Sequence, residues 1–347
     1  MEYFENTAHL SAPVLRALEA VPFPSVDAAA PAKLLARCPK AAQTPLITSE
    51  ALAEHAKLAA VYVKDERTRM GLGSFKALGA AYVIARDAEA GAVSGQTYVT
   101  ASAGNHGLSV AAGAAAFSAQ AVIYLAETVP EAFADRLRAL GAEVRRAGAI
   151  YEASMAAAAK DATQNGWTLL SDSSWPGYLD RPHRLMEGYT VLMQEAALQM
   201  PEPPSHIFLQ AGVGGLAAAC AAYARKVWGD APTIVVVEPE VAPALYASVQ
   251  AGAPQVTEGP VSEMGRLDCK EPSLIALKGL ARDASGFMTI SEDEGRLGRD
   301  ACDSAGLPST PSGAAGVAGM LAAGSGAGPV LSPDTRALVI LSEEAGA

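Results

Sequence analysis

A single lysine, Lys76, lies in the glycine-rich stretch GLGSFKALGA. Gly71 and Gly73 permit close backbone approach, and the sequence predicts Ser74 as the N-cap of a helix that begins at Phe75. In the first turn of that helix the macrodipole disfavours a positive charge, and together with burial it would lower the pKa of the lysine amine. A free amine can bond to a carbonyl carbon, so Lys76 is a candidate catalytic residue. The alternative is an ordinary lysine at the surface.

The loop TASAGNHGLS, residues 100–109, offers hydrogen-bond donors where a strand ends and a helix begins. Exposed backbone amides at such a helix start bind anions such as a substrate carboxylate. Asn105 could donate to a ring oxygen, and Ser102 could help to hold the carboxylate. We therefore expect a substrate to be bound by Ser102, Ala103, Gly104, Asn105 and His106. The alternative is a capped turn with His106 packed beneath it.

A strand, a glycine-rich loop and a helix are predicted for LQAGVGGLAAA, residues 209–219. The backbone amides of this loop could bind a phosphate group. The pattern also matches GxGxxA, and Glu238 at the end of the next predicted strand could hold a ribose, as in a nicotinamide-binding protein. A tight turn that binds nothing is the remaining alternative.

These three features together match what pyridoxal phosphate requires, whereas a dinucleotide site explains only the glycine-rich loop. Lys76 would bond to the aldehyde of the cofactor, the glycine-rich loop would hold its phosphate, and Asn105 would contact its ring hydroxyl. Three further basic residues could bind a second carboxylate of the substrate, although such side chains are more often solvated or paired with acidic neighbours: Arg69, Arg266 and Lys270.

Short β-rich runs alternate with alanine-rich helical stretches along most of the chain. Strands are predicted at TYVT (97–100), AVIYLAE (121–127), WTLLSD (167–172), HIFLQ (206–210), TIVVVEP (233–239) and ALVILS (337–342). Apolar runs without in–out alternation are typical of parallel strands that are covered on both faces. The predicted fold class is therefore α/β.

Charge and composition exclude several kinds of partner. The chain of 347 residues has a formal net charge of −11, which argues against nucleic acid and acidic membrane surfaces because both are polyanions. We see no secretory signal at the start and no apolar run near the roughly 18 residues that span a bilayer. The four cysteines form no CxxC pair and the histidines have no metal-ligand spacing. We expect a cytoplasmic protein without a metal site.

The motifs together resemble the fold-type II pyridoxal-phosphate enzymes, the tryptophan synthase beta superfamily, and most of all its diaminopropionate ammonia-lyases. KDERTRMGLGSFKALGAAY resembles the cofactor-lysine segment of that family, and LQAGVGGLAAA resembles its phosphate loop. Four other stretches are also similar: SDSSWPGY (171–178), MEGYTVLMQEA (186–196), VEPE (237–240) and EMGRLDCKEPS (263–273). The resemblance implies two open, mostly parallel sheets with flanking helices. It also implies a homodimer whose cofactor lies between a large domain, residues 1–86 and 182–347, and a small domain, residues 87–181.

On this resemblance, Asp172 in SDSSWPGY matches an acidic residue that orients or protonates the leaving group, and capping the turn before Trp175 is its alternative role. Ala103 replaces the Asp that the lyases carry before GNHG, which is implicated as a base for D-configured substrates. The loop instead resembles that of threonine and serine dehydratases. Pro311 takes an acidic position near the C-terminus. The implied cofactor-binding residues are Lys76, Phe75, Asn105, Gly212, Val213, Gly214, Gly215, Leu216, Glu238 and Ser342, with Ser342 facing the pyridine nitrogen.

The expected activity is an α,β-elimination on a small β-substituted amino acid, which gives a 2-oxo acid and ammonia. Lys76 would remove the α-proton while the cofactor takes up the developing charge. A 2,3-diaminopropionate-like substrate follows from the resemblance, and a β-hydroxy amino acid such as serine, threonine or 3-hydroxyaspartate is the alternative. A nicotinamide-dependent oxidoreductase and a non-catalytic relative of the enzymes remain as alternatives of other classes.

Overall fold

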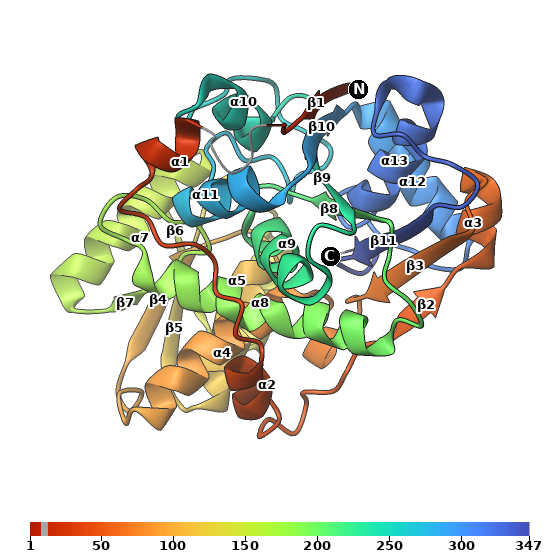
Figure 1. The fold of residues 1–347 in the computed structure, drawn as a ribbon. Coiled ribbons are helices and arrows are strands. Elements are labelled where there is room, and N and C mark those ends of the chain that lie inside the picture. The colour runs from red at the N-terminus through yellow and green to blue at the C-terminus, as the bar shows by residue number, and fades with distance from the viewer. Residues whose placement is uncertain (8–12, 347) are drawn as a thin grey trace.

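The computed structural model describes residues 1–7 and 13–346 and contains two β-sheets flanked by helices (Figure 1). The larger sheet has seven strands in the order β1-β10-β9-β8-β11-β3-β2. Its strands are β1 (Glu2–Glu5), β2 (Leu46–Thr48), β3 (Ala60–Asp65), β8 (His206–Gln210), β9 (Thr233–Pro239), β10 (Gly286–Ile290) and β11 (Arg336–Leu341). The edge strands β1 and β2 pair antiparallel, and the inner pairs are parallel.

The smaller sheet has four parallel strands in the order β6-β5-β4-β7. They are β4 (Thr97–Ala101), β5 (Gln120–Leu125), β6 (Glu143–Arg146) and β7 (Thr168–Leu169). The apolar runs in β4, β9 and β11 are buried almost throughout, as expected for strands that are covered on both faces. The predicted α/β class with two mostly parallel sheets is confirmed, although WTLLSD contributes only a two-residue strand.

Helices cover both sheets and fill the space between them (Figure 1). They are α1 (Pro13–Ala17), α2 (Ala29–Leu35), α3 (Glu50–Ala56), α4 (Lys76–Glu89), α5 (Asn105–Ala116), α6 (Glu131–Ala139), α7 (Tyr151–Asn165), α8 (Asp180–Gln199), α9 (Gly215–Trp228), α10 (Ala244–Ala251), α11 (Leu274–Asp283), α12 (Glu292–Ser304) and α13 (Ala315–Ala322), with short turns η1 (Arg69–Gly71) and η2 (Ala323–Ala327).

Helices α4 and α8 pack on each other and connect the two sheets. α4 also contacts α5, which covers the smaller sheet, and α8 contacts α9, which covers the larger one. The helices approach closely because Gly188 has no side chain: a Cβ there would lie 2.7 Å from the carbonyl oxygen of Leu78. The domain boundaries expected after residues 86 and 181 fall inside these two helices, and the division into two domains stays a prediction.

Within residues 1–7 and 13–346, no helix is long and apolar enough to cross a bilayer. The same residues contain no group of three or more His, Cys, Asp or Glu side chains that could hold a metal ion. All four cysteines are free thiols.

Candidate active site

Lys76 is the first residue of α4. The two residues before it, Ser74 and Phe75, pair with the segment that follows β11. The prediction that Ser74 caps this helix is wrong, because Phe75 occupies the N-cap position and no side chain makes a capping hydrogen bond. Ser74 is fully buried and instead forms a β-bridge with Glu343. The Phe75 N–H donates to the carbonyl oxygen of Ser342 (3.2 Å), so the end of β11 fixes where α4 begins.

The Lys76 amine lies in a partly buried cleft. Its Nζ donates to the Asp172 carboxylate, and the two side chains are 21% and 20% exposed. The nitrogen also lies 5.3 Å from the centroid of the Phe75 ring and 6.0 Å from that of Tyr189, within the range of a cation–π contact.

The charge states of Lys76 and Asp172 differ from the expectation that the pKa of Lys76 is lowered. Burial alone would lower the pKa of Lys76, but the Asp172 carboxylate outweighs burial and raises that pKa, so the predicted lowering is wrong for this state of the protein. Burial alone would likewise raise the pKa of Asp172, and the Lys76 ammonium instead holds it well below its usual range. The pair is therefore an ammonium and a carboxylate at neutral pH.

The loop at residues 102–106 follows β4 and opens α5, as predicted. The Ser102 hydroxyl accepts a hydrogen bond from the Gly104 N–H (3.2 Å), which shapes the turn. The His106 ring is buried, its Nε2 donates to the Leu170 carbonyl oxygen (2.8 Å), and burial lowers its pKa, so the ring is neutral. His106 therefore packs beneath the loop, which was the alternative to a role in substrate binding.

A buried carboxylate, Glu343, lies beside Asn105. The Asn105 Nδ2 donates to Glu343 Oε2 (2.5 Å), and the Thr310 hydroxyl donates to Oε1. Glu343 is 3% exposed, and burial raises its pKa. The Ser342 hydroxyl makes no hydrogen bond within the described residues, so its role at the pyridine nitrogen stays a prediction, whereas the Glu343 carboxylate reaches the asparagine loop.

The glycine-rich loop between β8 and α9 is tightly enclosed. A Cβ on Gly212 would lie 3.0 Å from the Cys269 sulfur, and a Cβ on Gly214 would lie 2.9 Å from Leu245. Gly214 also has a φ of +96°, which residues with a side chain rarely adopt. Inside the loop, the Val213 carbonyl accepts from the Ser273 N–H (3.0 Å), and Leu216 is buried. The first amides of α9 lack acceptors in their own helix and are available to an anion.

Two side chains place this loop next to Lys76. The Tyr189 ring, which lies 6.0 Å from Lys76 Nζ, has its Cε2 3.7 Å from the position of a Cβ on Gly215. Cys269 packs on the loop, with its sulfur 3.0 Å from the position of a Cβ on Gly212, and the charges of Asp172 and Lys76 are near enough to influence the pKa of its thiol. Burial raises the pKa of the Cys269 thiol to about 12, so it is not a thiolate nucleophile at neutral pH. The three sequence motifs therefore meet at the carboxyl ends of the two sheets.

The prediction that Glu238 binds a cofactor is wrong. Glu238 is fully buried, and its two carboxylate oxygens accept the backbone N–H groups of Leu245 and Tyr246 at 2.8 Å each. Burial raises its pKa to about 8. The residue caps the start of α10 and is fully enclosed by protein, so a ribose cannot reach it, and the nicotinamide alternative loses its acidic residue.

Two of the three candidate basic residues are also engaged elsewhere. Arg69 is 2% exposed and donates to the carboxylates of Glu66 and Glu195, at 2.7 Å in each case. Lys270 forms an ion pair with Asp268 (2.7 Å) and donates to two backbone carbonyl groups. Neither is free to bind a substrate carboxylate. The third, Arg266, extends over the loop at residues 102–106.

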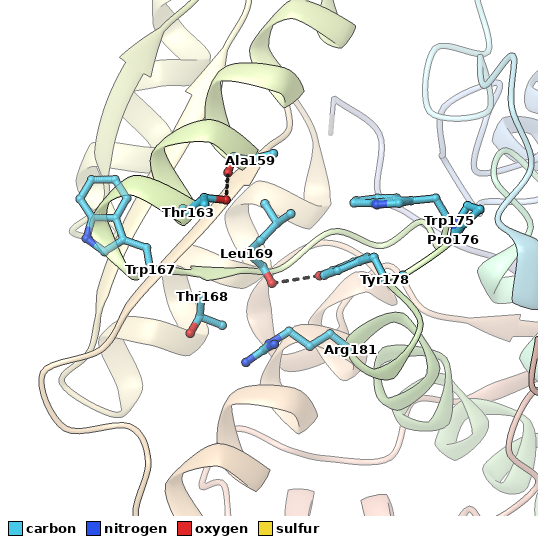
Figure 2. A pocket seen from close by; sticks show the side chains of 11 residues that line it. Ala159, Thr163, Trp167, Thr168, Leu169, Trp175, Pro176, Tyr178 and Arg181 are labelled. Atoms are coloured by element: carbon cyan, nitrogen blue, oxygen red, sulfur yellow. Dashed lines mark hydrogen bonds between the residues drawn. The ribbon is translucent and has the colours of Figure 1, made fainter.

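The segment that carries Asp172 folds back on itself, with the Trp175 and Tyr178 rings stacked 4.4 Å apart (Figure 2). The Tyr178 hydroxyl donates to the Leu169 carbonyl oxygen (2.9 Å). These residues and Arg181 line a surface cavity of about 480 Å³, which includes none of the predicted site residues. The cavity is thus distinct from the cleft around Lys76.

Sequence reasoning missed Tyr189, Cys269 and Glu343 as members of the cleft. The only available signal was that Tyr189 and Cys269 occur in stretches that resemble a known family, MEGYTVLMQEA and EMGRLDCKEPS. The Tyr189 hydroxyl is buried and lies beside the Lys76 amine.

The residues present fit pyridoxal phosphate. Asn105 Oδ1 is a buried polar atom without a partner in the described part of the chain, and a bound polar group would satisfy it. The amine of Lys76 matches an aldehyde, and a helix N-terminus opened by glycines matches a phosphate.

Comparison with known proteins supports the same cofactor. The model of the pyridoxal-phosphate dependent enzyme family matches residues 38–343. The chain is 31% identical over 284 residues to the diaminopropionate ammonia-lyase of Salmonella typhimurium, a match that covers 74% of this chain and 70% of that protein. It is 29% identical over 251 residues to a serine dehydratase-like protein of Mus musculus, covering 72% of each. A crystal structure of the Escherichia coli diaminopropionate ammonia lyase, in complex with an aminoacrylate-PLP azomethine reaction intermediate, matches with a TM-score of 0.85 and 27% identity over 99% of this chain and 93% of that one.

Proposed function

Since the chain belongs to the family of pyridoxal-phosphate-dependent enzymes, we propose that it is an ammonia-lyase that acts on a β-substituted amino acid similar to 2,3-diaminopropionate. The reaction is an α,β-elimination that yields a 2-oxo acid and ammonia. The observation that carries this proposal is the Lys76–Asp172 pair, which lies in one cleft with the glycine-rich loop. The match to diaminopropionate ammonia-lyases over most of the chain supports the same reaction class.

The cofactor, when bound, supplies an electron sink that stabilises negative charge at the α-carbon of the substrate. Lys76 is the residue that would attach covalently to its aldehyde, the amides at the start of α9 would hold its phosphate, and Asn105 would face its ring hydroxyl. The Phe75 and Tyr189 rings lie beside the amine and shield part of it from water.

Proton transfer in the cleft depends on Lys76 and Asp172. Once a substrate has displaced it from the cofactor, Lys76 would be a neutral amine whose Nζ removes the α-proton, and the ammonium that results would be stabilised by the Asp172 carboxylate. While Lys76 is charged, Asp172 is ionised and cannot itself be the acid. We therefore assign the proton that reaches the leaving group to Lys76, and to Asp172 the orientation of the amine.

The enzyme should be selective for L-configured substrates. Ala103 stands where the resemblance implies an Asp that serves D-isomers, and its side chain cannot accept a proton. We expect ammonia release from L-2,3-diaminopropionate and at least a hundredfold lower kcat/KM for the D-isomer, on the scale of a lost general base. Equal rates for the two enantiomers in a coupled ammonia assay would contradict this assignment.

A β-hydroxy amino acid dehydratase is the second candidate. The observation that favours it is the loop TASAGNHG, which carries Ala103 and resembles the dehydratase loop, together with the match to the serine dehydratase-like protein. The two candidates differ only in the leaving group, so the same cleft residues serve both.

Three further properties belong to the proposal. The large domain would comprise residues 1–86 and 182–347, and the small domain residues 87–181, with the cofactor between them. We also propose a homodimer, which size-exclusion chromatography with light scattering would test. A cytoplasmic location is supported by the four free thiols.

An ammonia-release screen tests the proposed function. It includes both enantiomers of 2,3-diaminopropionate, serine and threonine, and all stereoisomers of 3-hydroxyaspartate. We expect release from at least one of them in the wild type and none above background in Lys76→Ala. Bound cofactor without ammonia release from any of these amino acids would support a non-catalytic relative instead.

A further inference from the structure

The side chain of Arg266 extends from the glycine-rich loop after β8 to the loop that follows β4. Its backbone is held on the side of the larger sheet, where its N–H donates to the Ser312 hydroxyl (3.2 Å) and its carbonyl oxygen lies 3.1 Å from the position of a Cβ on Gly212. Its Cδ and Nε then lie 3.3 Å from the position of a Cβ on Gly104, which follows the smaller sheet. The guanidinium therefore lies over the loop that opens α5.

This guanidinium has almost no partners within the described residues. Its one hydrogen bond runs from Nη1 to the Ala103 carbonyl oxygen at 3.3 Å. Glu343 Oε2 lies 3.9 Å from Nε, beyond hydrogen-bond distance, and the Glu343 carboxylate already accepts from Asn105 and Thr310. Glu343 thus orients the arginine without using its N–H donors. The Arg266 side chain is 35% exposed, so a ligand in the cleft can reach it.

The other two candidate basic residues, Arg69 and Lys270, differ from Arg266 because their charged groups are fully paired. Arg69 is fully enclosed by two carboxylates, and Lys270 is paired with Asp268 and two carbonyl groups. The Arg266 side chain is half-buried, and within the described residues its fork makes one long hydrogen bond, to Ala103, and one ion-pair contact at 3.9 Å, to Glu343. Its remaining N–H donors match the geometry of a carboxylate, which an arginine can bind through two parallel hydrogen bonds.

We propose that Arg266 binds a second carboxylate of the substrate, so that the preferred substrates are β-amino or β-hydroxy derivatives of aspartate. This inference rests on the proposed function, in which the amides at the start of α5 would hold the α-carboxylate and leave Arg266 for another acidic group. A β-ammonium group without a neighbouring carboxylate would meet the guanidinium as a like charge.

Matched pairs of ligands that differ only by the β-carboxylate test this inference. Calorimetry on the holoenzyme compares aspartate with alanine, neither of which has a leaving group on its β-carbon, and ammonia release compares 3-hydroxyaspartate with serine. We expect the wild type to bind aspartate roughly 10- to 100-fold more tightly than alanine, the scale of a hydrogen-bonded charge pair, and Arg266→Gln to lose that preference with alanine binding unchanged. Arg266→Lys, which keeps the charge and loses the fork, should fall between the two.

Arg299→Gln is the matched control, because Arg299 lies on α12 and, in the part of the chain that the structure describes, its side chain hydrogen-bonds only to its neighbour Asp300. It should keep the wild-type preference. An unchanged preference in both Arg266 variants, or an equal loss of aspartate and alanine binding in Arg266→Gln, overturns the inference. Failure of the proposed function is a different result: no ammonia from any amino acid, whatever the ratio of the two binding constants.

Discussion

At the scale of single residues, the sequence identified Lys76 because a charged side chain is unusual among glycines at a helix start. It could not reveal the charge state of the amine, since that depends on Asp172, 96 positions further along the chain. A local pattern contains only the dipole and the apolar neighbours, both of which lower the pKa of a lysine. The tertiary contact with a carboxylate reverses the sign.

The first prediction concerns that contact. In the cofactor-free protein, Asp172→Asn should lower the free energy of unfolding at pH 7 by about 1–3 kcal/mol, the scale of a hydrogen bond to a charged group. The pKa of Asp172 is lower in the folded than in the unfolded state, so its contribution is present above the ordinary aspartate value of about 3.9 and is lost as the pH falls through the folded value. The pKa of Lys76 is raised, so its contribution is lost only as the pH rises above about 10.4.

Urea denaturation from pH 7 down to pH 3 measures this difference, with the exposed Asp293→Asn as a control. The gap between wild type and Asp172→Asn should stay constant down to about pH 4 and then narrow. A gap that widens on acidification would show that the pair is not ionised.

At the scale of elements, the strand–loop–helix order of the glycine-rich segment was predictable, but the role of Glu238 was not. Acidic residues at strand ends occur in dinucleotide sites, and only the three-dimensional structure shows that α10 begins where its amides reach Glu238. The start of α4 was misplaced for a similar reason. Ser74 is a good capping residue by type, but its backbone is bonded to the segment after β11.

Gly214→Ala should weaken cofactor binding at least tenfold. The new Cβ would lie 2.9 Å from Leu245 and 3.0 Å from Ala276, and the φ of +96° adds backbone strain. Gly166→Ala is the matched control, because Gly166 also has a positive φ, +67°, but has no atom within 4 Å of the new Cβ. Fluorescence titration of the cofactor-free proteins should give a normal affinity for Gly166→Ala and a stability loss of about 1 kcal/mol. Equal affinities in both variants would mean that the loop does not contact the phosphate.

At the scale of the whole molecule, the sequence predicted the class of the two sheets but not their strand order or the antiparallel edge strands. β1, β2 and β6 are short or carry charged side chains, so they lack the long apolar runs that reveal the inner strands. The boundaries expected after residues 86 and 181 lie within α4 and α8, which are continuous helices at these positions.

The contact between α4 and α8 should control both stability and the position of Lys76. Gly188→Ala places a Cβ 2.7 Å from the Leu78 carbonyl oxygen, which forces the helices apart at a cost of about 1–3 kcal/mol. Because Lys76 begins α4, we also expect a lower kcat in this variant. Gly324→Ala, with no atom within 4 Å, is the control for thermal unfolding and turnover. A Gly188→Ala protein as stable and active as the control would show that the helices tolerate separation.

Reduction of the cofactor-loaded protein with borohydride, followed by mass mapping of its peptides, tests most directly whether Lys76 carries the cofactor. The predicted result is a single phosphopyridoxyl modification on the peptide that contains Lys76, together with loss of the visible absorbance band in Lys76→Ala. A modification on Lys64, Lys270 or any other lysine, with Lys76 unmodified, would contradict the assignment of the active site.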